Sequence, residues 1–365
     1  MYRLGDSVIY TLYGESHGEY IGGLLEGIPA GMEVSVDKIN SELTLRKPSE
    51  GIGTTRKEPD EVEFLSGVWG GKTTGERIHY RIKNANTDSS KYDIFNKTPR
   101  PGHADLPAIA KFRDYTIRGG NQFSGRLTVS VVVAGSIARQ FISARGIHVS
   151  AFTRSIGGIK DEGDRTIKDA DTSKKYKTRA ATEELDAAMT DEILNAAADG
   201  DSVGGVIECV VTGLPIGFGG TWFESLDSEI ARAVFSIPAC KAVEFGKGFG
   251  LADMRGSESN DPYYYDNGIR LRSNNMGGIL GGMSNGAPVV FRAAFKPTPS
   301  IAKEQDTIDL ETMQEAKLRI EGRHDPCIVP RAVIVVESVT CLVIADQIRR
   351  EELSALGGTA QDQSK

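Results

Sequence analysis

The amino-acid sequence predicts a mixed α+β fold in a single domain. Strand-like and helix-like segments interleave along 365 residues without the regular spacing of a doubly wound parallel sheet. The chain shows no short repeat of the kind that builds solenoids. Its 39% hydrophobic and 25% charged residues are typical of a globular rather than a disordered chain. We expect residues 1–351 to form the domain and 352–365 a flexible C-terminal tail.

The first 84 residues favour paired strands around one helix. Residues 1–33 alternate apolar segments with glycine-rich turns, as neighbouring strands do. Residues 35–45 predict a helix, because Ser35 can cap its start and apolar side chains recur on one side. Residues 46–60 are polar, basic and interrupted by two prolines, which predicts a mobile loop. Residues 61–84 predict a strand, a turn at a glycine pair and a second strand.

The middle of the chain is harder to interpret. Residues 96–126 carry many Gly, Pro and Arg residues and little regular pattern. Within 126–141, the first half favours a strand and the second half a helix by propensity; we expect one buried helix after a glycine-rich turn. Residues 160–180 are polar and charged, which predicts an exposed excursion.

The second half predicts further helices and strands in alternation. The expected helices are 182–198 and 226–235, and the expected strands are 203–212 and 288–295. Pro330 suits the first turn of a long apolar helix that we expect to reach about Arg350, with frayed residues from Leu353 onward.

Several protein classes are excluded by composition. The net charge of −7 argues against a nucleic-acid partner, and four widely spaced cysteines without a CxxC pair argue against a zinc site or a disulfide framework. No stretch of about 20 apolar residues is present to span a membrane. The amino terminus lacks the basic start and apolar core of a signal peptide. We therefore expect a cytoplasmic protein without bound metal.

Glycine is over-represented, at 42 of 365 residues against roughly 7% on average. The glycines cluster, which is typical of backbone that approaches a ligand closely. One cluster, Gly14-Glu15-Ser16-His17-Gly18, could suggest a hydrolase nucleophile. Adjacent residues on an extended strand point to opposite faces, however, so Ser16 and His17 are poorly placed as a nucleophile–base pair. A polar turn is the simpler interpretation of this cluster.

Three further segments combine rigid backbone with cationic or proton-transferring side chains. Two prolines flank Arg100 and a glycine precedes His103, which suits anion binding and proton transfer, although a surface turn is equally compatible. Residues 118–126 expose backbone N–H groups before a helix start, which favours a phosphorylated ligand. Arg323, His324 and Asp325 precede the long apolar helix, where charged groups require partners or a function. These residues indicate a polyanionic small substrate without naming a reaction.

Eight segments in order resemble the signature segments of the chorismate synthase family. They are GESHG, RKEPDEVEFLSG with KTTGERI, PRPGHAD, IRGGNQFSGR, SIPACKAVEFG, NNMGGILGG, KPTPSI and GRHDPCIVPRAV. The resemblance runs from about residue 5 to about residue 348. It implies a β-α-β sandwich, usually assembled as a homotetramer with the flavin near subunit contacts. It also implies 1,4-anti elimination of phosphate from 5-enolpyruvylshikimate 3-phosphate to give chorismate, with reduced FMN as cofactor.

The resemblance also assigns expected roles to residues of this chain. His103 would protonate the leaving phosphate, His17 would protonate the flavin or keep it in its productive form, and Asp325 would relay the abstracted proton. Substrate binding is expected from Ser16, Arg46, Arg100, Arg126 and Arg323. Cofactor binding is expected from Gln122, Phe123, Ser124, Pro238, Ala239, Gly281, Lys296, Pro297, Thr298, Pro299, Ser300 and Arg323.

The chain departs from the family pattern at two places. Many members have GGGRSSAR where this chain has GGNQFSGR, so Gln122 and Phe123 replace an arginine and a serine. The 46–60 loop is one residue shorter, and an arginine usual before its TT pair is absent, for which Arg56 could compensate. A non-catalytic flavin- or phosphate-binding relative is therefore the alternative. The chain lacks a Rossmann GxGxxG segment, which favours an external flavin reductase.

Overall fold

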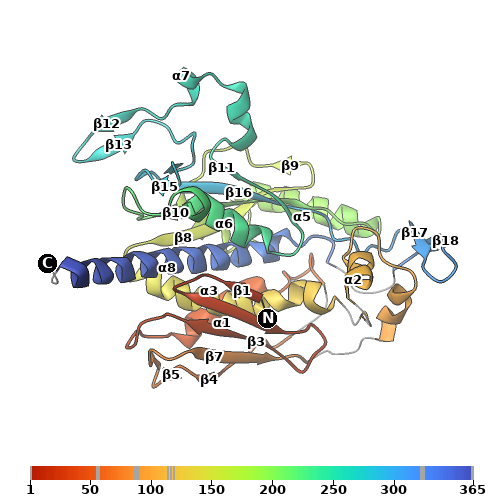
Figure 1. The fold of residues 1–365 in the computed structure, drawn as a ribbon. Coiled ribbons are helices and arrows are strands. Elements are labelled where there is room, and N and C mark those ends of the chain that lie inside the picture. Colours follow the sequence, from red (N-terminus) through yellow and green to blue (C-terminus); the bar gives the residue numbers. More distant parts are fainter. Residues whose placement is uncertain are drawn as a thin grey trace.

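Two five-stranded sheets enclose a layer of helices. A computed structural model describes residues 2–54, 58–85, 90–112, 115, 117, 120–320 and 325–362. Helices α1 (Val36–Arg46), α3 (Thr128–Ser143) and α8 (Val329–Asp362) lie between the sheets (Figure 1). This β-α-β arrangement confirms the mixed α+β class.

The first sheet is antiparallel throughout, in the order β1-β2-β3-β7-β4. Its strands are β1 (Tyr2–Leu4), β2 (Ile9–Gly14), β3 (Tyr20–Glu26), β7 (Ile78–Lys83) and β4 (Val62–Ser66). The side chains of Ile21, Leu25, Ile78, Tyr80 and Ile82 are fully buried, which sets the face that packs on the helices. A short hairpin, β5 (Val68–Trp69) and β6 (Lys72–Thr73), turns at the expected glycine pair.

The second sheet is also antiparallel, in the order β11-β16-β10-β8-β9. Its strands are β11 (Cys240–Phe245), β16 (Val289–Phe295), β10 (Gly205–Thr212), β8 (His148–Ile156) and β9 (Ile159–Lys160). Three small hairpins lie outside it: β12 (Tyr263–Tyr265) with β13 (Ile269–Leu271), β14 (Ile279–Leu280) with β15 (Met283–Ser284), and β17 (Gln305–Asp309) with β18 (Gln314–Leu318).

The central helices pack closely because one of their contacts is a glycine. A Cβ on Gly135 of α3 would lie 2.3 Å from the Cβ of Ser338 on α8, so only glycine permits this crossing.

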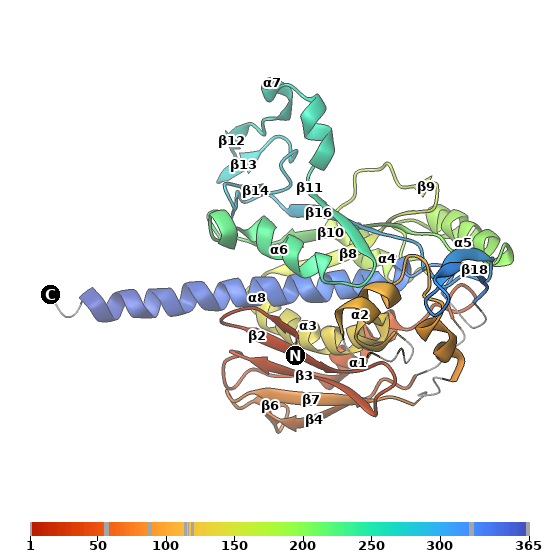
Figure 2. The same ribbon diagram turned by 45° about the vertical axis from the view of Figure 1, so that its right-hand side comes forward.

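Ser35 caps α1 by accepting a hydrogen bond from the Lys38 backbone N–H, as the sequence predicted. The helical interpretation of 126–141 is confirmed by α3. Helix α8 continues beyond Arg350 to Asp362 and projects past the rest of the fold (Figure 2).

The remaining helices surround this framework. They are α2 (Asp105–Lys111), α4 (Ile167–Ser173), α5 (Glu183–Ala198), α6 (Leu226–Phe235) and α7 (Gly256–Ser259), with short 3-10 turns η1 (Ser90–Asn96), η2 (Asn121–Phe123), η3 (Gly125–Leu127), η4 (Trp222–Glu224) and η5 (Gly248–Asp253). The expected helices at 182–198 and 226–235 are confirmed. Helix α2 lies in the segment that we expected to be irregular.

The expectation of an exposed excursion at 160–180 is wrong. Helix α4 packs against β8 and buries Ala170 and Ser173 completely. Thr178 is also buried, and its carbonyl accepts a hydrogen bond of 2.6 Å from the Thr153 hydroxyl on β8. The segment is mostly charged, and only a few small side chains between the charged ones cover the sheet, so its composition does not reveal the packing.

In the described residues, no helix has both the length and the hydropathy that a membrane crossing requires.

Candidate active site

A cavity of about 770 Å³ opens where the C-terminal end of α1, the start of α3 and the start of α8 meet. Its size lies within the roughly 300–1,000 Å³ typical of small-molecule sites. The loops that follow α1 and β16 complete the wall, together with the proline-rich turn before α2.

The cavity wall is strongly cationic. Among the described residues, seven lysines and arginines line it, against three carboxylates. The cations are Arg46, Lys47, Arg100, Arg126, Lys241, Lys296 and Arg331, and the carboxylates are Glu58, Asp60 and Asp325. The protein as a whole carries a net charge of −7, so this concentration of positive charge is local. Such a wall attracts a ligand with several negative charges.

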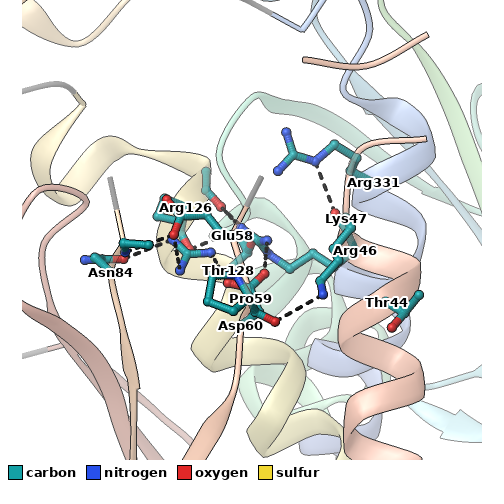
Figure 3. Close-up of polar contacts among 12 residues, drawn as sticks. Thr44, Arg46, Lys47, Glu58, Pro59, Asp60, Asn84, Arg126, Thr128 and Arg331 are labelled. Carbon is teal, nitrogen blue, oxygen red and sulfur yellow. Dashed lines mark hydrogen bonds and ion pairs between the residues drawn. The ribbon is translucent and has the colours of Figure 1, made fainter. Parts of the chain in front are cut away.

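Two of the arginines surround one buried carboxylate (Figure 3). Arg46 Nη1 lies 3.4 Å from Asp60 Oδ2, and Arg126 Nη1 donates a short hydrogen bond to Asp60 Oδ1. Arg46 Nε also donates to the Thr128 hydroxyl at 3.1 Å, and Arg126 Nε donates to Asn84 Oδ1 at 3.0 Å. Several independent contacts therefore fix both guanidinium planes.

The pKa of Arg46 reflects this crowding of positive charge. Burial, followed by the nearby Arg331 guanidinium, lowers the pKa of Arg46 to about 9, while Asp60 acts in the opposite direction. Arg126 adds to the lowering. A bound anion would relieve the repulsion, so the arrangement favours an anionic ligand.

The turn before α2 holds a histidine, an arginine and an aspartate together. Gly102 adopts φ +69°, a conformation that L-residues rarely take, and this bend places His103 over the start of α2. Asp105 accepts two hydrogen bonds from the Arg100 side chain, at 2.6 and 2.8 Å. Its Oδ1 also lies 2.6 Å from His103 Nδ1, so we assign the Nδ1 proton to this contact.

Asp105 is held ionised by these partners. Burial opposes ionisation, but the hydrogen bonds from Arg100 and His103 prevail and hold the pKa of Asp105 well below its usual range. The unfolded chain therefore takes up this proton at higher pH than the folded protein does. The resulting stabilisation is complete above about pH 4 and decreases as the pH falls toward the folded pKa.

Asp105→Asn should therefore reduce the loss of stability that acid causes below about pH 4. Denaturant unfolding followed from pH 7 to pH 2 would measure this, with the exposed Asp266→Asn as control. An unchanged acid dependence in the Asp105 variant would contradict the assignment.

Asp325 lies at the start of α8 and faces the loop that follows α1. Its Oδ1 accepts a hydrogen bond of 2.7 Å from the Thr54 backbone N–H, and its Oδ2 forms a short ion pair with Arg331 Nη1. Arg331 Nε in turn donates to the Arg46 carbonyl at 3.1 Å. Asp325 thereby connects α8 with α1 and its following loop.

The chorismate synthase family profile matches residues 8–348. A curated relative from Thermococcus kodakarensis, described as chorismate synthase, is 47% identical over 95% of this chain and 97% of its own length. A second, from Korarchaeum cryptofilum and described in the same way, is 46% identical over 94% of this chain and 96% of its own length. A solved structure titled "Crystal Structure of Chorismate Synthase" superposes with a TM-score of 0.76 at 29% identity, covering 95% of this chain and 93% of that one.

The chain belongs to the chorismate synthase family. Its function is the conversion of 5-enolpyruvylshikimate 3-phosphate to chorismate in the shikimate pathway, which leads to the aromatic amino acids. It is a lyase that releases phosphate. The non-catalytic alternative is thereby set aside, and so is the hydrolase interpretation of the GESHG segment.

The geometric argument against that hydrolase was nevertheless wrong. Ser16 and His17 lie in a turn after β2 rather than on a strand, and Ser16 Oγ lies 3.0 Å from His17 Nδ1. Ser16 is buried, and neither residue lines the cavity. The His17 ring makes an edge contact with Tyr92, which does line it, at 5.5 Å between ring centroids. This chorismate synthase segment thus lies behind the cavity wall.

Most residues that we expected to contact flavin line the same cavity. They are Gln122, Phe123, Ser124, Pro238, Ala239, Lys296, Thr298, Pro299 and Ser300. Pro297 is exposed beside them and does not line the wall, and Gly281 lies apart in the exposed β14–β15 turn. Burial, followed by the neighbouring Lys241, lowers the pKa of Lys296. Arg56, Arg323 and His324 lie outside the described residues.

Further charged residues of the site were not singled out from the sequence. Glu58, Asp60, Asp105, Lys241 and Arg331 fall within the quoted family segments and Lys47 lies outside them, but nothing in their local pattern indicates a partner. The sequence holds one signal at Asp60, which is that this residue follows Pro59. In the structure the Asp60 backbone is left-handed, with φ 52°. A Pro-Asp pair is compatible with such a turn but does not specify it.

Proposed function

We propose that the 1,4-anti elimination takes place in this cationic cavity with reduced FMN bound beside the substrate. The observation that carries the proposal is the cationic wall, with seven lysines and arginines, next to the His103–Asp105 pair. The substrate bears two carboxylates and a phosphate, and guanidinium groups bind such groups through paired hydrogen bonds. A smaller or less charged substrate would not need this wall.

The residues present fit a flavin with a phosphate tail. The Thr298 hydroxyl is buried and has no hydrogen-bond partner among the described residues, and it lies in the same loop as Ser300. Lys241 lies close enough to Lys296 to contribute, after burial, to the lowering of the Lys296 pKa. We propose that this loop and the two lysines hold the flavin phosphate, with Phe123 and Ala239 beside the ring. When bound, reduced FMN supplies electron density to the substrate ring as phosphate leaves.

The chain's own residues would bind the substrate and manage protons. Arg126 would orient an anionic group of the substrate, and Arg46 would add positive charge beside it. The cavity wall would exclude water from these groups. His103, protonated at both ring nitrogens, would donate its Nε2 proton to the leaving phosphate, while its Nδ1–H stays hydrogen-bonded to Asp105. Asp325 would accept the ring proton, and His17 with Ser16 would hold a proton behind the cavity wall, next to Tyr92.

We also propose a cytoplasmic homotetramer. Trp222, Phe223, Phe249 and Tyr265 are 82–91% exposed, and large exposed apolar side chains of this kind usually mark contact surfaces. Reduction of the flavin would come from an external reductase, because the sequence has no dinucleotide-binding fingerprint.

An anaerobic assay tests the proposal. The protein is mixed with dithionite-reduced FMN and the enolpyruvyl substrate, and release of phosphate and chorismate is followed. We expect turnover with reduced FMN and none with oxidised FMN. Turnover that is independent of the flavin's redox state would refute the cofactor assignment. Replacing dithionite by NADPH tests the reductase, and turnover with NADPH alone would contradict external reduction.

A further inference from the structure

We propose that Asp60 is a positioning residue, one that aims the guanidinium of Arg126 at the substrate's anionic group and braces Arg46 beside it. The inference rests on the proposed function of the cavity. It adds a residue that carries no ligand itself but sets the geometry of Arg126, which does, and of Arg46 beside it (Figure 3).

The carboxylate of Asp60 lies between the two guanidinium groups. Each of its oxygens faces a different arginine, with Oδ2 3.4 Å from Arg46 Nη1 and Oδ1 in a short hydrogen bond with Arg126 Nη1. Its side chain is only 1% exposed. A buried carboxylate shared by two cations holds both in fixed relative orientation, since either would otherwise repel the other.

The remaining donors of Arg46 are directed at the protein. Its Nη2 faces the carbonyls of Gly125 and Arg126, at 3.5 and 3.3 Å, and its Nε faces Thr128. Arg46 therefore serves mainly as a brace between α1 and the start of α3.

Arg126 is different, because one of its donors has no hydrogen-bond acceptor. Its Nη2 is buried and unsatisfied among the described residues, and Glu58 Oε2 lies 3.9 Å from it, beyond hydrogen-bond distance. An unsatisfied buried donor on a cavity wall indicates a ligand atom that completes it. Asp60 and Asn84 hold the other two nitrogens, so they determine where Nη2 is directed.

The backbone of Asp60 is adapted to this position. Its φ of 52° lies in the left-handed region, which aspartate and asparagine tolerate better than most residues. Lys47 Nζ donates to the Pro59 carbonyl at 3.1 Å, so contacts from residues 46 and 47 to residues 59 and 60 close the base of the loop. Asp60 thereby couples the position of the loop after α1 to the orientation of the Arg46 and Arg126 guanidinium groups.

A competing role for Asp60 predicts a change in KM in the opposite direction. If Asp60 only neutralised positive charge, removing its charge would strengthen the field of the cavity and tighten substrate binding. If Asp60 positions Arg126, removing its charge weakens binding although the cavity becomes more positive. The direction of the change in KM therefore separates the two roles.

The test is Asp60→Asn, which keeps the side-chain shape and tolerates the left-handed backbone. We expect KM for the enolpyruvyl substrate to rise about 10- to 100-fold, the equivalent of one charge-assisted hydrogen bond, with a much smaller fall in kcat. The dissociation constant of FMN should be unchanged, because the proposed flavin loop does not contact Asp60. The control is Glu63→Gln, which removes an exposed carboxylate paired with Arg81 outside the cavity.

An unchanged or lower KM in folded Asp60→Asn overturns the inference while leaving the proposed function intact. Failure of the proposed function would show differently, as a wild-type protein without flavin-dependent turnover. Should Asp60→Asn not fold, Arg126→Lys replaces it, because lysine keeps the charge but cannot bridge Asp60 and Asn84. A wild-type KM in folded Arg126→Lys would equally overturn the inference.

Discussion

Replacing His103 with alanine is expected to lower kcat by about 10²–10⁴-fold, the usual contribution of a general acid. FMN binding should remain largely intact, because the His103 ring is not part of the proposed flavin loop. The measurement is phosphate release under anaerobic conditions with reduced FMN, together with FMN titration of the variant.

The expectation follows from how the side chain is held. Arg100 and Asp105 are both buried, and Asp105 contacts His103 Nδ1 at 2.6 Å, so the imidazole is oriented by a carboxylate that is itself fixed. The His103 side chain is 16% exposed and lines the cavity, so it can meet a ligand without being freely solvated. An imidazole that is oriented in this way and protonated at both nitrogens is suited to transfer its Nε2 proton to a leaving oxygen.

His148→Ala is the matched control. His148 also contacts a carboxylate, Asp171, at 2.9 Å, but it is 45% exposed and does not line the cavity. Its loss should leave turnover unchanged. Wild-type turnover in His103→Ala would remove His103 from the proton transfer and direct attention to another acid.

Much of the fold could be predicted from local pattern. Helices α1 and α5 have a capping residue followed by periodic apolar positions, so capping and periodicity agree with the final structure. Strand β8 was not predicted. Seven of its nine positions are buried and the other two are half-buried, so its sequence shows no clean alternation of apolar and polar residues.

The candidate site was predictable only in part, for a physical reason. Rigid turns and family segments identify His103, Arg100 and Arg126 along the chain. The partners of these side chains depend on tertiary structure: Arg126 and Asp60 are 66 positions apart in sequence. No local pattern specifies which carboxylate a distant guanidinium will meet. Asp105 is only five positions from Arg100, yet its role also depends on the bend at Gly102.

A buried charge in α8 shows the same limit. In the sequence, Glu337 only interrupts a long apolar run; in the structure it is completely buried and joins elements from across the fold. Its Oε2 accepts a hydrogen bond of 2.6 Å from Arg139 on α3, and its Oε1 accepts one of 2.7 Å from the Ala151 N–H on β8. Lys174, just after α4, lies 3.4 Å from Oε1.

Glu337→Ala is therefore expected to lower the free energy of unfolding by about 3–5 kcal/mol, the usual effect of leaving a buried charge without its partner. Among the described residues, Arg139 would keep one carboxylate partner, Glu42. Burial raises the pKa of Glu42, which therefore holds its own charge less firmly. Urea unfolding at one fixed protein concentration measures the loss.

Glu352→Ala on the same helix is the control for this prediction. Glu352 pairs with Arg145 at 2.8 Å and with Arg349, but its side chain is 34% exposed, so we expect a loss below about 1 kcal/mol. Equal losses in the two variants would show that burial does not amplify the Glu337 pair. A much larger loss at Glu337 would mean that this carboxylate fixes α8 against α3 and β8. Arg331 stands in the first turn of α8 and pairs with Asp325 just before the helix, so that packing also places the α8 side of the cavity.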